Sequence, residues 1–114
     1  MLTLVIPEVR EQLRTLLSAH SLQALVFSTM SCPASARFDV PDPTYMCSSP
    51  DPYRASYVGS VSGYPEITVP AGRVTGNMPV GLSLLGTPYS EESLIALAAA
   101  FEAAIPAPAP PELR

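Results

Sequence analysis

The sequence contains no lysine, and only 14% of its 114 residues are charged. Soluble domains usually carry about 25% charged residues. The basic residues are all arginines, they are scattered along the chain, and the net charge is −4. Without a basic stripe to neutralise phosphates, nucleic-acid binding is disfavoured. Because 47% of the residues are apolar, two interpretations remain open: part of the surface is covered by protein, or this is an ordinary domain of low solubility.

Long hydrophobic runs are also absent. No apolar stretch approaches the ~20 residues that a membrane span requires. The segment from Met1 to Pro7 has neither the positive region nor the long apolar core of a signal peptide. We therefore expect a cytoplasmic protein that does not associate with a membrane.

Cysteine and histidine are scarce. The chain has two cysteines, Cys32 and Cys47, and one histidine, His20. A structural zinc ion needs four such ligands, so no metal site is expected, and nothing in the sequence points to a cofactor. A disulfide is possible in principle, but a cytosolic location favours two free thiols.

The hydrophobic pattern predicts an α/β fold. Pro7 suits the first position of a helix, and Ser90, followed by two glutamates, suits an N-cap. A short helix or turn is expected over residues 53–62. Apolar periodicity places the main helices near 7–20 and 90–105, and strands near 22–28, 66–70 and 80–85.

The last two strands are expected to form an antiparallel hairpin. Between them, the loop from Ala71 to Pro79 contains Gly72, Gly76 and Asn77, which tolerate positive φ. Gly81, inside the second strand, suggests a bulge or a close approach of backbone.

The helix near 90–105 is rich in alanine and nearly apolar all round. Such a helix is usually buried on more than one side. Residues 1–105 are expected to form the domain, and residues 106–114 an extended proline-rich tail. One apolar face at helical spacing is formed by Leu94, Leu97, Ala98, Phe101 and Ile105.

Residues 29–52 hold many prolines and are expected to form a long loop. Long loops inside compact domains are usually functional or disordered. Asp39, Asp42 and Asp51 lie in this loop without the spacing of a calcium site, so we interpret them as solvated turn residues.

The residues from Gly63 to Gly86 carry the string Gly-x-Pro-x-Ile-Thr-Val-Pro-Ala-Gly, followed by Pro-Val-Gly-Leu. Together with the acidic start of the alanine-rich helix, this string resembles the carboxy-terminal portion of the amidase signature family of amide hydrolases. The resemblance covers roughly Val9 to Ala104. It implies the C-terminal edge of an α/β fold, a mixed sheet fragment with a β-hairpin and flanking helices.

The family's catalysis uses a Ser–cis-Ser–Lys triad in a glycine- and serine-rich region upstream of this portion. Because this sequence has no lysine and no such run, no catalytic residue is assigned to it. The resemblance implies instead that the end of the first strand faces the substrate pocket. The residues concerned are Ser28, Thr29, Ser31 and Cys32, and the alternative is that they only cap the strand.

Three functional hypotheses follow. The first is a C-terminal fragment of an amide hydrolase, inactive alone, whose partner is the N-terminal part of an amidase or a second copy of the chain. The second is a non-catalytic binding module derived from an amidase, which docks through its alanine-rich helix and open strand edge. The third is an independent enzyme using His20, although a histidine at a helix end is more often solvated or a cap. The substrate amide is not specified.

Overall fold

The computed structural model describes residues 2–35, 39–41, 43, 45, 47–48, 50–110 and 112. Its strands form one antiparallel sheet in the order β1-β3-β2. The α/β class with a hairpin and flanking helices is therefore confirmed. The elements are α1 (Leu2–Ala19), β1 (Leu25–Ser28), α2 (Ser56–Ser62), β2 (Glu66–Val74), β3 (Met78–Leu85) and α3 (Glu91–Ala104).

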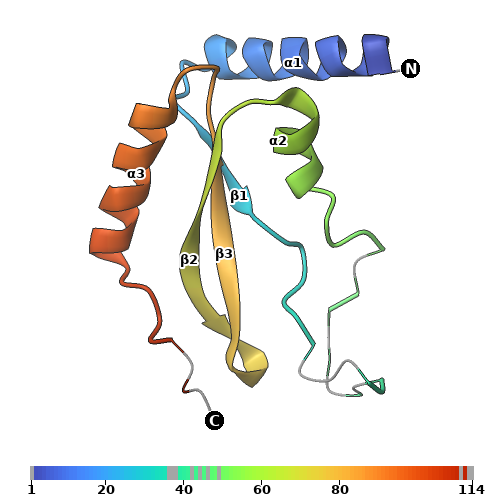
Figure 1. Cartoon of the computed structure of the whole chain (residues 1–114), viewed down its shortest axis with the longest axis vertical. Coiled ribbons are helices and arrows are strands. Elements are labelled where there is room, and N and C mark those ends of the chain that lie inside the picture. Colours follow the sequence, from blue (N-terminus) through green and yellow to red (C-terminus); the bar gives the residue numbers. More distant parts are fainter. Residues whose placement is uncertain are drawn as a thin grey trace.

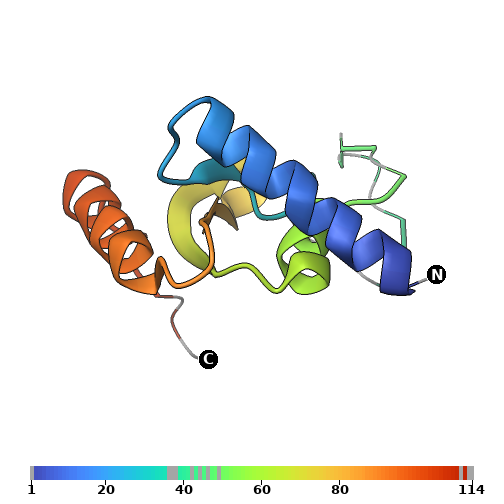
Figure 2. The same cartoon turned by 90° about the horizontal axis from the view of Figure 1, so that it is seen from above.

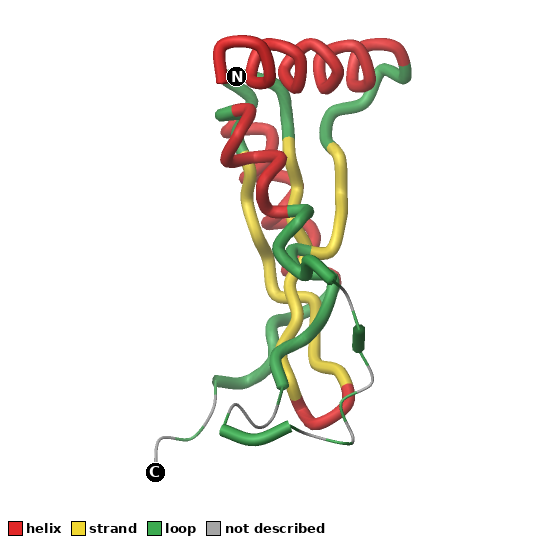
Figure 3. Tube along the Cα trace, turned by 90° about the vertical axis from the view of Figure 1, so that its right-hand side faces the viewer, coloured by secondary structure: helices red, strands yellow, loops and turns green. Residues whose placement is uncertain are grey.

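The helices surround the sheet on three sides. α1 lies across one end of the strands, while α2 and α3 lie on opposite sides of them (Figures 1 and 2). The hairpin of β2 and β3 runs away from α1 to the other end of the molecule (Figure 3). None of the described helices is long and apolar enough to cross a membrane.

The hairpin confirms the predicted antiparallel pairing. Ile67 lies opposite Leu84, and Val69 lies opposite Leu82. Both strands extend into the region predicted as a loop, because a register shift after Pro70 allows pairing to continue as far as Val74. The reversal is confined to a short 3-10 turn, Thr75–Asn77, in which Gly76 and Asn77 adopt positive φ as predicted.

Two boundaries near the N-terminus differ from prediction. α1 begins at Leu2, so Pro7 lies inside the helix and not at its first position. The cost is limited to one intrahelical hydrogen bond, because a proline has no N–H to donate. The strand predicted from residue 22 begins at Leu25, since the Leu22 N–H donates to the Leu17 carbonyl at 2.8 Å and closes the helix end.

The main core lies between α3 and the hairpin. Val69, Leu84, Leu94 and Ala98 are buried together, and Leu97 and Phe101 pack against them. Four of the five residues predicted for the inner face of α3 are therefore confirmed. Ile105 follows the end of the helix and is 48% exposed, because the chain leaves the helical path after Ala104.

The outer face of α3 is open, contrary to the expectation that this helix is buried on more than one side. Ile95 is 60% exposed. Ser90 occupies the N-cap position as predicted, but its hydroxyl donates to the Thr87 carbonyl at 2.6 Å and makes no capping bond to the helix. An exposed apolar face remains available on this helix.

A second set of contacts joins α1 to α2. Arg10 Nε donates to the Ser62 carbonyl at 2.6 Å, and the Tyr64 hydroxyl donates to the Arg10 carbonyl at 3.0 Å. Ser62 and Leu17 are fully buried near this junction. These bonds fix the turn between α2 and β2, and thus the start of the hairpin, relative to α1.

Candidate functional site

A hollow of about 520 Å³ lies beside the end of β1. One wall is the loop that follows β1, and the other is the middle of the hairpin. Residues far apart in the sequence therefore meet here, as expected for a long functional loop. Its lining includes Thr29, Cys32, Tyr45, Tyr53, Thr68 and Gly81.

The four residues predicted to line a pocket are divided by the structure. Thr29 and Cys32 line the hollow. Ser28 is the last residue of β1 and is exposed opposite Leu82. The Ser31 N–H donates to the Pro52 carbonyl at 3.1 Å, which ties the two ends of the long loop together.

A chain of three hydroxyls forms part of this region. Thr29 Oγ1 lies 2.9 Å from Ser83 Oγ, and Thr68 Oγ1 lies 3.1 Å from the same atom. Ser83 is completely buried. A Cβ on Gly81 would meet Thr29 Oγ1 at 3.2 Å and Thr68 Cγ2 at 3.1 Å, so glycine is needed for these threonines to approach. This is the close approach that Gly81 indicated.

Ser83→Ala tests the importance of this hydroxyl chain. The variant leaves both threonine hydroxyls without their buried partner, so we expect the free energy of unfolding to fall by about 1–3 kcal/mol. Urea denaturation of the two proteins measures the difference. Ser60→Ala, at an exposed site on α2, is the control and should change stability by less than about 0.5 kcal/mol. Equal losses in both variants would contradict a special role for Ser83.

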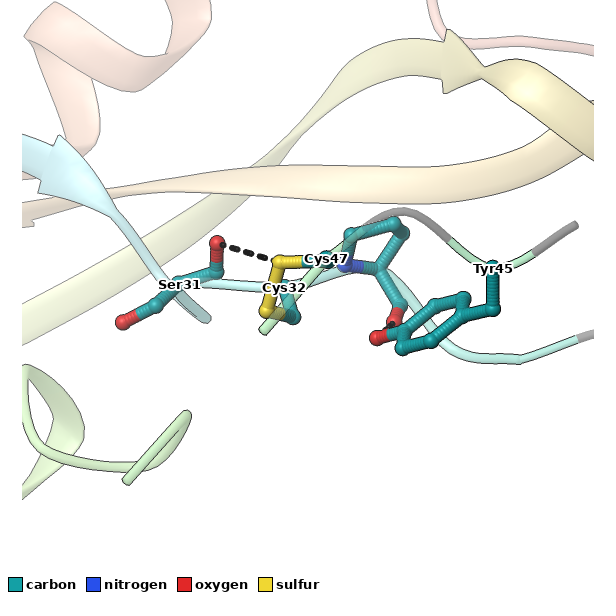
Figure 4. The surroundings of a disulfide bond; sticks show 5 residues. Ser31, Cys32, Tyr45 and Cys47 are labelled. Carbon is teal, nitrogen blue, oxygen red and sulfur yellow. Dashed lines mark hydrogen bonds between the residues drawn. A yellow bond between two sulfur atoms is a disulfide. The ribbon is translucent and has the colours of Figure 1, made fainter. Parts of the chain in front are cut away.

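The long loop is closed by a disulfide between Cys32 and Cys47, shown in Figure 4. The expectation of two free thiols is therefore wrong for this structure. Their Cα atoms lie 5.7 Å apart, within the range that a disulfide spans. The expectation depended only on the cellular compartment, whereas the reversal of the loop brings the cysteines together.

Other contacts hold the same loop in place. The Tyr45 hydroxyl donates to the Pro33 carbonyl at 2.6 Å (Figure 4). Cys47 Sγ lies 3.7 Å from the Ser31 carbonyl oxygen. This second approach is a contact and not a hydrogen bond, because a disulfide sulfur has no hydrogen to donate. The wall of the hollow is thus braced on both sides of the disulfide.

The acidic residues of the loop form no metal centre in the part of the chain that the structure describes. Asp51 Oδ1 accepts a hydrogen bond from the Tyr53 N–H at 3.2 Å, so Asp51 is a turn residue as interpreted from the sequence. Asp42 lies outside the described residues.

His20 lies far from these residues in the fold, at the exposed end of α1. It borders a shallow hollow of about 380 Å³ that is lined only by α1 and the residue after it. Glu11, in the same lining, forms an exposed ion pair with Arg14, which holds the pKa of Glu11 below its usual value. Within the described residues, no hydrogen bond links His20 to a nucleophile or an acid, as a catalytic triad requires.

Sequence reasoning missed Thr68, Ser83 and the two tyrosines of the hollow. The hairpin register offered one usable signal: Thr68 pairs directly with Ser83, and the predicted strands already contained both residues. Tyr45 and Tyr53 gave no such signal, because their positions depend on how the proline-rich loop folds back.

Known proteins with similar sequences belong to one kind of enzyme, the glutamyl-tRNA(Gln) amidotransferase. Its matching subunit in Methylocella silvestris is 46% identical over 52 residues, which is 46% of this chain and 10% of that protein. The corresponding protein of Streptococcus suis is 52% identical over 44 residues, or 39% of this chain and 9% of that protein. The chain therefore spans about a tenth of the length of these relatives. No protein-family model matches the chain.

Solved structures extend the likeness to most of the fold. The peptide amidase of Stenotrophomonas maltophilia matches 90% of this chain with 33% identity and a TM-score of 0.60, over 20% of its own length. The glutamyl-tRNA(Gln) amidotransferase protein of Thermotoga maritima matches 90% of this chain with a TM-score of 0.66, over 21% of its own length. At 24% identity, the second match supports the fold alone.

Proposed function

Because this chain corresponds in sequence and fold to part of the amidase signature enzymes, consistent with their carboxy-terminal portion, we propose that it supplies one wall of an amide-binding cleft. The hollow beside β1 is the observation that carries this proposal. It combines the strand end that the resemblance assigns to the cleft with a hydroxyl-bearing hairpin and a braced loop.

The chemistry of amide hydrolysis is proposed to come from elsewhere. Attack on an amide needs an activated nucleophile and donors that stabilise the oxyanion. In the amidase signature family, a lysine begins this activation, and the present sequence has none. We therefore expect the chain to bind but not to hydrolyse amides by itself.

The partner that completes the site is proposed to be the N-terminal part of an amidase. Val26 on β1 is 61% exposed, and among the described strands β1 pairs only with β3, which leaves its outer edge open. An open edge is a ready site for strand addition. The same exposed edge, with Ile95 on α3, favours a second candidate function, a non-catalytic interaction module that docks onto another chain or a second copy.

Complementation tests the proposed role. The chain is mixed with the N-terminal part of a related amidase, and hydrolysis of a panel of simple amides is followed. We expect turnover to appear on mixing, and Thr68→Val to raise KM several-fold with little change in kcat, because Thr68 lines the hollow and does not react. Thr15→Val on α1 is the matched control. A fall in kcat alone, or equal effects of both variants, would contradict a substrate-binding wall.

Two further expectations remain proposals. Residues 1–105 are proposed as the folded unit and 106–114 as a tail, and Arg73 Nη2 donates to the Ala109 carbonyl at 2.6 Å, which ties that tail to β2. A cytoplasmic location is also proposed, and it has a chemical consequence. In a reducing compartment Cys32 and Cys47 would be thiols, so thiol alkylation of the protein inside cells tests the location.

A further inference from the structure

The hollow beside β1 contains no charged side chain in its described lining. We propose that it is a subsite for an uncharged aromatic or apolar group that carries an amide, and that it rejects carboxylates and phosphates. The assignment of the amide rests on the proposed function above. The preference for an uncharged group rests only on the residues of the hollow.

Rings form much of the wall. Tyr45 and Tyr53 contribute aromatic surface, and Pro33, Pro52 and Pro79 contribute saturated rings. Both tyrosines are positioned by bonds to the loop, Tyr45 through its hydroxyl on the Pro33 carbonyl and Tyr53 through its N–H on Asp51. Aromatic rings favour offset or edge-to-face contact with another ring, and they offer large apolar area to any uncharged group.

The hydroxyl chain supplies a polar contact. Thr29, Ser83 and Thr68 together have three hydroxyl protons, and the two contacts through Ser83 Oγ use two of them. Ser83 is completely buried, so the arrangement that satisfies it best leaves the third proton on Thr29 or Thr68. Both threonines line the hollow, and the described residues give that proton no other acceptor. A ligand carbonyl oxygen is the acceptor that fits.

An ionised ligand group would gain nothing here to replace its hydration. Moving a charge out of water without a counter-charge is costly. The carboxylate nearest along the chain to the lining is Asp51, next to Pro52, and its negative charge adds repulsion toward an anion. A carboxylate or phosphate is therefore disfavoured twice, by lost hydration and by Asp51.

Nuclear magnetic resonance titration of the full chain, labelled with nitrogen-15, tests this subsite. The probes are N-acetyl-L-phenylalaninamide and its 4-carboxy and 4-aminomethyl analogues, which differ mainly in charge. We expect the neutral probe to bind with a Kd on the order of 1 mM and to shift the amide signals of Thr29, Thr68 and Gly81. Both ionised analogues should bind at least about tenfold more weakly.

Three variants sharpen the test. Thr68→Val and Tyr53→Ala should each weaken binding of the neutral probe several-fold, whereas Thr15→Val on α1 should not change it. Ala34→Lys places a cation at an exposed position in the lining and should strengthen binding of the 4-carboxy probe. An ionised probe that binds the original chain as tightly as the neutral one would overturn the proposal. So would shifts that map away from the hollow, or no shifts at 20-fold the expected Kd (about 20 mM).

The failure of this inference and the failure of the proposed function are distinguishable. If complementation restores turnover but charged amides are preferred, the uncharged subsite is wrong and the amidase role stands. If the neutral probe binds in the hollow but no turnover appears on mixing, the subsite stands and the amidase role is wrong.

Discussion

Replacing Leu94 by alanine is expected to lower the free energy of unfolding by about 2–5 kcal/mol. Leu94 is only 2% exposed and packs on α3 against Val69 and Leu84 of the hairpin. The substitution removes buried apolar atoms and leaves a cavity at the centre of the main core. Because small domains have a total stability of about 5–15 kcal/mol, this loss should produce a clear shift in a urea denaturation curve.

The neighbouring residue provides the control. Ile95 lies one position further along α3 and is 60% exposed, so Ile95→Ala should cost less than about 1 kcal/mol. The pair thus compares the inner and outer faces of one helix with similar changes in side-chain size. If both variants lose equal stability, α3 is buried on both faces in solution, and the core described here is incomplete.

Reduction of the Cys32–Cys47 disulfide is expected to lower the free energy of unfolding by about 3 kcal/mol. The cysteines are 15 residues apart, and opening a loop of this length increases the conformational freedom of the unfolded chain. Denaturation with and without a phosphine reductant measures the effect. The Cys32→Ser/Cys47→Ser double variant should be as unstable as the reduced chain and should not respond to the reductant.

The disulfide prediction also reports on the hollow. Cys32 and Tyr45 line it, and both belong to the segment that the disulfide closes. The reduced chain should therefore bind the neutral amide probe more weakly than the oxidised chain. Identical denaturation curves for the oxidised and reduced chains would show that the disulfide does not brace this loop.

The sequence predicted those parts of the fold that depend on local patterns. The inner face of α3 followed from apolar spacing, and the hairpin followed from Gly76 and Asn77, which do adopt positive φ. Strand ends were less accurate, because the bulge after Pro70 depends on cross-strand pairing and not on local preference. The start of α1 was missed because Pro7 resembles a helix start wherever it stands in the first turns.

The candidate site was predictable only at its strand end. Thr29 and Cys32 were singled out by the point where β1 gives way to a loop. Tyr45, Tyr53 and the disulfide partner Cys47 come from the irregular proline-rich segment, whose path has no periodic signal. Their meeting with the hairpin depends on long-range contacts, which propensity and spacing do not encode.

The most direct test of the central claim is the amide hydrolase activity of the purified chain alone. If the chain contributes binding and not chemistry, hydrolysis of a panel of simple amides should stay at the buffer background. His20→Ala should leave that result unchanged, since His20 is exposed at the end of α1 and away from the hollow. Turnover that survives repurification of the chain, and that His20→Ala abolishes, would contradict the account and identify an independent enzyme.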